Sequence, residues 1–87
     1  MAGRPEIKPG DWIRVGNRDC VVTNVREPDH ALGDCEVVFD PSKPTNHDVV
    51  WNDDEWKFVE SGDYGGYADK YPRLSEYVRI LKRGRWA

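Results

Sequence analysis

The chain has 87 residues, a formal net charge of −3 at pH 7 and 33% charged residues, which is typical of one small globular domain. No stretch approaches the roughly 20 apolar residues of a membrane span, so we expect a cytoplasmic protein without a membrane partner. The two cysteines, Cys20 and Cys35, do not form a Cys-x-x-Cys pair, and the two histidines are isolated. The sequence therefore predicts buried free thiols, no metal site and no cofactor.

A tight hairpin is expected near the N-terminus. Two β-type runs, Trp12–Val15 and Arg18–Val25, flank the dipeptide Gly16-Asn17, which tolerates the positive φ angles of a two-residue turn. With this loop, the inner face would carry Ile13, Cys20 and Val22. A change of one residue in the loop would exchange the two faces, so the position of Trp12 stays open.

Two further segments complete the predicted sheet. The run Cys35–Phe39 alternates apolar and polar residues, and we expect its first, third and fifth side chains to point inward. Residues 49–59 are predicted to form a second hairpin with a turn at Asp53-Asp54. In that register the residues sharing one apolar face are Val49, Trp51, Trp56 and Phe58.

A loop rich in glycine and tyrosine follows over residues 61–71. Its aromatic faces and nearby carboxylates would attract a cationic side chain of a partner through cation–π and charge interactions. A loop whose tyrosines merely cap the barrel is the alternative that remains open. The predicted partner-binding residues are Tyr64, Tyr67, Tyr71, Asp63 and Asp69.

Residues 72–83 fit two different structures. The apolar residues Leu74, Tyr77, Val78 and Leu81 recur at helical spacing, with Pro72 at the start and Gly84 at the end. Alternatively, one helical turn leads into a strand over residues 77–81. The β-branched Val78 and Ile80, and the need to close the sheet against the first strand, favour the strand, which is our expectation.

Charge is unevenly distributed along the chain. Residues 27–69 carry twelve acidic and two basic groups, whereas residues 70–87 carry six basic groups and one acidic group. Either the basic ends fold over the acidic middle, or the molecule shows two faces of opposite sign. The residues of a basic surface near the C-terminus would be Arg79, Lys82, Arg83, Arg85 and Trp86.

The strand pattern of residues 10–15, 21–25 and 35–39, with a closing turn and strand over residues 74–81, resembles SH3-like barrels of the KOW and Tudor type. The resemblance implies an all-β barrel of five or six antiparallel strands with one short helical turn before the last strand. We expect a flexible N-terminus over residues 1–8, one domain over residues 9–83 and a basic tail over residues 84–87. The segment Arg18-Asp19-Cys20 departs from KOW segments, which usually carry a second glycine there, and the Tyr-rich signature of eukaryotic SH3 domains is missing.

No catalytic signature is present, so we expect a binding protein and not an enzyme. The first hypothesis is a protein-interaction module that binds a basic protein or peptide through the tyrosine-rich loop. The alternatives are nucleic-acid binding through the basic C-terminal segment, or a structural subunit of a larger assembly. We expect a monomer or weak self-association.

Overall fold

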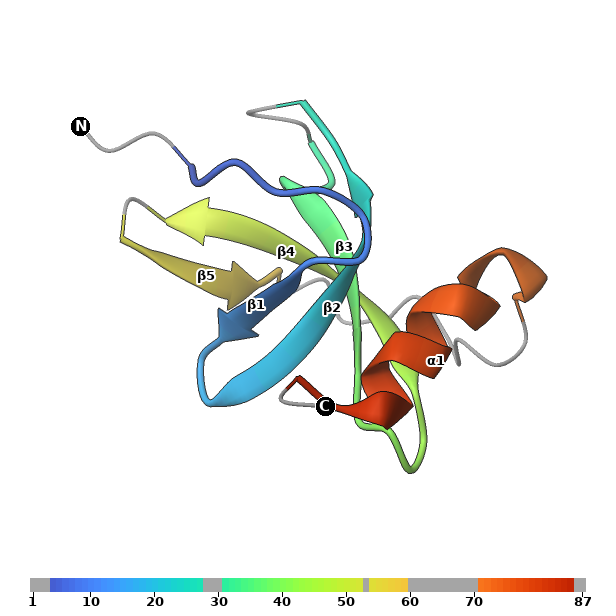
Figure 1. The fold of residues 1–87 in the computed structure, drawn as a ribbon. Coiled ribbons are helices and arrows are strands. Elements are labelled where there is room, and N and C mark those ends of the chain that lie inside the picture. The colour runs from blue at the N-terminus through green and yellow to red at the C-terminus, as the bar shows by residue number, and fades with distance from the viewer. Residues whose placement is uncertain (1–3, 28–30, 53, 60–70, 86–87) are drawn as a thin grey trace.

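Five strands form a closed barrel in the computed structural model, which describes residues 4–27, 31–52, 54–59 and 71–85. The strands follow one another around the barrel in sequence order, and a short 3-10 helix and an α-helix come after them (Figure 1). The elements are β1 (Trp12–Val15), β2 (Arg18–Val25), β3 (Cys35–Phe39), β4 (Thr45–Asn52), β5 (Glu55–Phe58), η2 (Pro72–Leu74) and α1 (Ser75–Arg83). The predicted small all-β barrel is confirmed.

Both hairpins have the predicted register. Ile13 lies opposite Cys20 across the β1–β2 turn, and Gly16 in that turn has a φ of 61°. In the second hairpin, Trp51 lies opposite Trp56 and Val49 opposite Phe58. Local turn chemistry was enough to place these pairs, because a two-residue turn leaves one register.

The expectation of a purely antiparallel sheet was wrong. Each consecutive pair of strands is antiparallel, but the barrel closes through a parallel contact in which Val15 of β1 lies opposite Trp56 of β5. The reason is the number of strands. When five strands alternate in direction, the first and the fifth point the same way, so closure has to be parallel.

The expected closing strand over residues 77–81 was also wrong, because these residues belong to α1. Strand β5 already closes the barrel against β1, so no sheet edge is left for a sixth strand. The helical spacing then decides the structure: Leu74, Val78 and Leu81 are buried, whereas Arg79 between them is exposed. Gly84 ends the helix with a φ of 93°.

The molecule has two apolar clusters on the two faces of one sheet wall. The inner cluster fills the barrel and contains Ile13, Val15, Cys20, Val22, Cys35, Val37, Val49 and Trp56. The outer cluster lies under α1 and contains Val21, Val38, Leu74, Val78 and Leu81, with Trp12 packed against it. Strand β2 is therefore buried on both faces, and the open question of Trp12 is answered by contact with the outer cluster.

Both thiols are free and buried, as predicted. Burial is the main cause that raises the pKa of Cys20 to about 12, and the same cause raises the pKa of Cys35 to about 12. Within the described residues, no helix has the length and apolar character needed to cross a membrane.

Candidate functional site

The predicted tyrosine-rich surface lies largely outside the described residues. Tyr64, Tyr67, Asp63 and Asp69 all fall in the range 60–70, which the structure does not describe. Tyr71 is described: it is exposed, it directly precedes η2, and the guanidinium of Arg73 lies 5.8 Å from the centre of its ring. The partner-binding role of the five residues therefore stays a prediction.

The basic residues near the C-terminus divide into two groups. Arg79, Lys82 and Arg83 are exposed on the outer face of α1, and none of them forms an ion pair with a carboxylate of the described residues. Arg85 instead donates to Asp19 Oδ1 at 2.9 Å, which fastens the segment after α1 to the start of β2. Trp86 lies outside the described residues. The outer face of α1 is thus an uncompensated positive surface within the described chain.

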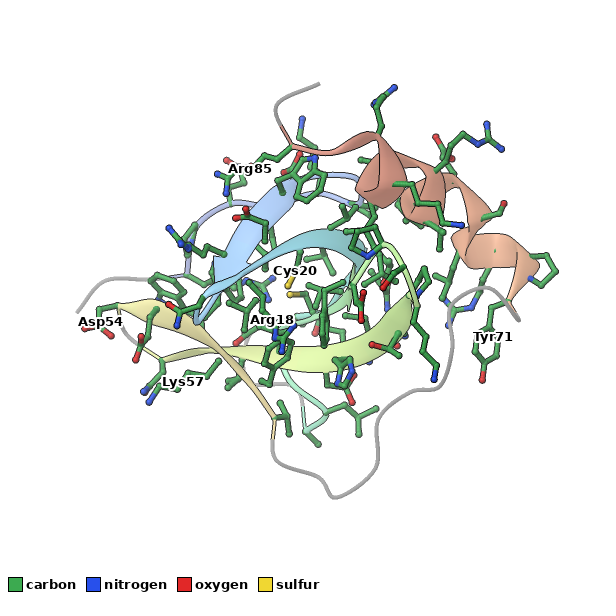
Figure 2. The ribbon with its side chains drawn as sticks, turned by 90° about the horizontal axis from the view of Figure 1, so that it is seen from below. Arg18, Cys20, Asp54, Lys57, Tyr71 and Arg85 are labelled. Carbon is green, nitrogen blue, oxygen red and sulfur yellow. The ribbon has the colours of Figure 1, made fainter. Side chains whose placement is uncertain are left out.

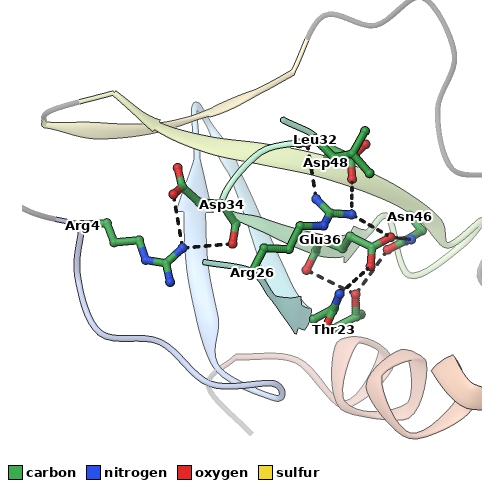
Figure 3. Close-up of polar contacts among 9 residues, drawn as sticks. Arg4, Thr23, Arg26, Leu32, Asp34, Glu36, Asn46 and Asp48 are labelled. Carbon is green, nitrogen blue, oxygen red and sulfur yellow. Dashed lines mark hydrogen bonds and ion pairs between the residues drawn. The ribbon is translucent and has the colours of Figure 1, made fainter. Parts of the chain in front are cut away.

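Three carboxylates of the acidic middle, those of Asp34, Glu36 and Asp48, pair with arginines (Figure 3). The guanidinium of Arg26 lies 2.9 Å from Asp48 Oδ1 and 3.5 Å from Glu36 Oε1, and it donates to the carbonyl of Leu32 at 3.3 Å. On the other side of the same wall, Arg4 donates to the carbonyl of Asp34 and lies 3.2 Å from its carboxylate. These contacts fold the basic N-terminal part over the acidic middle, whereas α1 keeps its positive charge.

A hydrogen-bonded network continues across β2, β3 and β4 beside Arg26. The amide of Asn46 donates to Glu36 Oε1 at 3.1 Å, and the hydroxyl of Thr23 donates to the carbonyl of Glu36 at 3.2 Å. The amide of Asn24 donates to Glu36 Oε2 at 3.2 Å. Thr23 and Asn46 are buried, and these hydrogen bonds satisfy polar groups that would be costly to bury without a partner. We assign this network to stability and not to a reaction.

An open hollow of about 500 Å³ lies against the β4–β5 hairpin. It is lined by Ala31, Gly33, Val50, Trp51, Asn52, Lys57, Phe58 and Val59. Leu32, beside this lining, is 55% exposed, and Val50 is 36% exposed. The exposed carboxylates of Asp54 and Glu55 lie at the tip of the same hairpin, and Glu55 is 3.5 Å from Lys57 Nζ.

Trp51 anchors the hairpin beneath the hollow. Its ring packs edge-to-face against Trp56 at 5.1 Å, and its backbone N–H donates to Asp34 Oδ2 at 2.7 Å. The indole Nε1 is buried and has no hydrogen-bond acceptor among the described residues. The pairing of Trp51 with Trp56 on one apolar face was predicted, whereas the position of Trp51 beside a hollow was not.

One end of the barrel carries a cluster of three rings, which we call the ring cluster: Phe39, His47 and Phe58. Their centroids are separated by 4.8 Å (Phe39–His47), 5.2 Å (Phe39–Phe58) and 5.5 Å (His47–Phe58). The guanidinium of Arg18 lies 4.9 Å from the centre of the Phe39 ring. Figure 2 shows Arg18 near the middle of the barrel in this view, with Arg85 beside α1 and with Asp54 and Tyr71 on opposite sides.

The polar groups around the ring cluster have defined partners. His47 Nε2 lies 3.1 Å from Thr45 Oγ1. Burial lowers the pKa of His47, and the positive charge of Arg18 acts in the same direction, whereas Asp48 opposes it. Hydrogen bonds from Ser42 lower the pKa of Asp40, whose backbone has a positive φ of 67°.

Neither the hollow nor the ring cluster was predicted as a site. The hollow is formed by the loop at residues 31–33 together with β4 and β5. These segments are separated in sequence, so no local sequence pattern predicts their contact. Two members of the ring cluster could be placed from the sequence. The alternation of residues 35–39 predicted that Phe39 points inward, and the hairpin register predicted that Phe58 lies opposite Val49. The contact of Arg18 with the Phe39 ring had no signal in the sequence.

The described residues contain no group of three His, Cys, Asp or Glu side chains that could hold a metal ion. Comparisons of the chain with protein-family models, with curated proteins and with solved structures found no match. The closed five-stranded barrel is compatible with an SH3-like fold, and a function has to be argued from the surfaces alone.

Proposed function

We propose that this protein is a non-enzymatic binding module whose main partner is a protein or peptide with apolar and basic side chains. The observation that carries the proposal is the hollow on the β4–β5 hairpin. Its volume of about 500 Å³ lies within the usual range of ligand pockets, and its walls combine apolar side chains with Asn52 and Lys57. Apolar anchoring in a pocket is the common energetic centre of a protein interface.

The charge of the partner follows from the edge of the hollow. Asp54 and Glu55 are exposed at the tip of the hairpin, close in sequence to Asn52 and Lys57, which line the hollow. A basic side chain flanking the apolar anchor would approach these carboxylates and accelerate association. We further propose that the tyrosine-rich loop contributes to binding the same kind of partner. Aromatic faces would come from Tyr64, Tyr67 and Tyr71, and negative charge from Asp63 and Asp69.

An amide NMR titration tests the proposal with short peptides in which one Leu or Phe is flanked by Lys and Arg. We expect shifts at residues 31–33, 50–52 and 57–59. The variant Val50→Lys should abolish them, because it places a positive charge on the apolar wall, whereas Val50→Thr keeps the shape of the side chain and should retain binding. Binding that survives Val50→Lys would contradict a role of the hollow.

The tyrosine-rich loop is tested in the same titration. Replacing Tyr64, Tyr67 and Tyr71 together by Ala should weaken the peptide that binds best, because ring faces contribute cation–π attraction. Unchanged affinity would remove the loop from the proposal and leave the hollow in place.

Nucleic-acid binding is the second candidate, and the outer face of α1 favours it. Arg79, Lys82 and Arg83 have no carboxylate partner among the described residues, so they are available to phosphates. The repulsion expected from the acidic middle is reduced, because Arg4 and Arg26 already pair with Asp34, Glu36 and Asp48.

Fluorescence anisotropy with a labelled oligonucleotide tests this candidate at about 50 and about 200 mM salt. Affinity should fall steeply with salt, and the double variant Lys82→Gln, Arg83→Gln should reduce the slope of log K against log salt by about 2. Lys8→Gln is the control, because Lys8 is an exposed cation on the N-terminal segment. A slope that is equally sensitive to both variants would contradict a surface on α1.

We also propose a fold family, a cellular location and an association state for this protein. A KOW-like or Tudor-like barrel is supported by the strand count and closure. A cytoplasmic location is supported by two free, buried thiols in a chain of this size. Weak self-association at most is our expectation, and sedimentation over a range of concentrations measures it.

A further inference from the structure

We propose that the ring cluster with Arg18 is a stacking site for an unpaired base of a single-stranded nucleic acid whose phosphates lie on α1. The inference rests on the second candidate function and names its ligand more closely. It assigns a role to Phe39 and His47, which neither candidate function uses, together with Phe58, which also lines the hollow.

The geometry of the ring cluster is that of a stacking platform. Its rings lie 4.8–5.5 Å apart, are tilted by 37–62° to one another and are half-buried, with Phe39 and Phe58 packed against the inner cluster. Arg18 is exposed, and its guanidinium lies 4.9 Å from the Phe39 ring. Aromatic rings and guanidinium planes are the two kinds of group on which proteins stack unpaired bases.

The platform and α1 are held near each other. Arg85, two residues after the end of α1, donates to Asp19 at 2.9 Å, and Asp19 directly follows Arg18 in β2. Figure 2 shows α1 along one side of the barrel end that has Arg18 near its middle. Because Arg18 and Asp19 are successive strand residues, their side chains point to opposite faces of β2. A strand with phosphates on Arg83 and Lys82 would turn around the start of β2 to bring its next nucleotides to the ring cluster.

Single strands fit this arrangement better than duplexes. Bases inside a duplex are stacked on one another and turn only their edges to a protein, whereas a single strand offers whole base faces. Asp40 lies in the turn after β3, and its carboxylate accepts a hydrogen bond from Ser42 Oγ at 2.6 Å. Arg18 contributes to the lowered pKa of Asp40, so the two opposite charges partly offset each other.

The experiment compares three labelled probes of about 10 nucleotides: a mixed-sequence single strand, an abasic single strand of equal charge, and a duplex. Anisotropy at low salt gives the affinity of each probe. We expect the base-containing single strand to bind about 5- to 100-fold more tightly than the abasic strand, which is the range of one stacked base. The duplex, whose bases are stacked on one another, should bind through its phosphates without a contribution from the ring cluster.

Two variants locate the effect. Phe39→Leu keeps an apolar side chain but removes the ring, and Arg18→Ala removes an exposed guanidinium that is outside the apolar core. Each should reduce the difference between base-containing and abasic strands. Lys8→Ala removes one exposed cation elsewhere and should leave the difference between the two strands unchanged. Since Arg18→Ala alters no core residue, the test stands even if Phe39→Leu perturbs the fold.

The outcomes separate this inference from the function on which it rests. Equal binding of base-containing and abasic strands, with the dependence on Lys82 and Arg83 intact, would overturn the stacking site and leave phosphate binding on α1. A base-dependent difference that persists in both Arg18→Ala and Phe39→Leu would place the base elsewhere and also overturn it. No binding of any probe would overturn both.

Discussion

Gly33 has the least room for a side chain among the described glycines. Its φ is +113°, and an added Cβ would lie 2.8 Å from the carbonyl oxygen of Val49 and 3.2 Å from Val59 Cγ2. The same carbonyl accepts a hydrogen bond from the Asp34 N–H at 2.8 Å. The chain therefore passes β4 at a distance that only glycine permits.

We predict that Gly33→Ala lowers the free energy of unfolding by about 2 kcal/mol or more, because backbone atoms have to move and a positive φ is strained. Gly16→Ala is the matched control: Gly16 has a φ of 61° with nothing within 4 Å of an added Cβ, so the expected loss is about 1 kcal/mol. Urea unfolding of the two variants measures the difference. Equal losses would mean that the contact with Val49 is not close in solution.

His47 predicts a pH dependence of stability. Its pKa in the folded state is lowered, chiefly by burial and further by Arg18, so the unfolded chain binds a proton more readily. The stability that neutral His47 contributes is complete above the unfolded pKa of about 6.5 and is lost as pH falls through the folded pKa. The effect should be modest, since the ring is partly exposed to solvent.

Urea unfolding at about pH 7.5 and about pH 5.5 tests this dependence, because carboxylates stay largely ionised in that window. The wild type should lose stability on acidification, and His47→Gln should lose less. An equal loss in both proteins would assign the pH dependence to other groups.

At the scale of elements, α1 depends on the outer cluster. Leu81 is 3% exposed and packs with Val21 and Val38 of the barrel wall. Leu81→Ala should cost about 2–5 kcal/mol, as expected for a buried leucine. Glu76→Ala, on the exposed side of the same helix, should change stability by less than about 0.5 kcal/mol. Denaturant midpoints compare the two, and similar losses would contradict tight packing of α1.

The same helix shows what sequence can and cannot predict. Hairpin registers were predictable because turn residues and strand alternation act over a few positions, as at Gly16 and at Trp51–Trp56. Whether residues 77–81 form a strand or a helix depended on whether five strands already close the barrel, which is a property of the whole sheet. Val78 and Ile80 prefer strands, but burial of Leu74, Val78 and Leu81 at helical spacing outweighs a propensity of a few tenths of a kcal/mol.

The surfaces were less predictable than the fold. The exposed cations Arg79, Lys82 and Arg83 could be listed from the sequence, yet the involvement of Arg85 in an ion pair with Asp19 joins residues that are 66 positions apart. The hollow and the ring cluster likewise combine distant segments. Sequence patterns report local alternation, and they do not report which loop lies over which strand.

At the scale of the whole molecule, the two thiols report on opening of the barrel. Cys20 and Cys35 share the inner cluster and are both fully buried, with pKa values raised to about 12. A thiol reagent at about pH 8 should therefore react slowly and at similar rates with both, and rapidly after denaturation. One thiol that reacts at the rate of a free peptide in the native protein would contradict this.

The same burial predicts weakening in alkali. A raised thiol pKa contributes stability that is complete below the unfolded pKa of about 8.5 and is lost as pH rises towards about 12. Thermal unfolding between about pH 8 and about pH 10 should show a falling midpoint. The double variant Cys20→Ala, Cys35→Ala, although less stable overall, should show a smaller fall.

The attachment of the two chain ends has a mechanical consequence. Gly10 and Asp11 extend the pairing of β1 through hydrogen bonds with Val22, so the N-terminal side is hydrogen-bonded along β2. The C-terminal side is held by packing of α1 on the barrel wall and by the ion pair between Arg85 and Asp19. Under tension applied at both ends, α1 can peel away turn by turn, whereas β1 has to be sheared from its neighbour. In a pulling experiment we therefore expect two unfolding steps, with the helix released at the lower force.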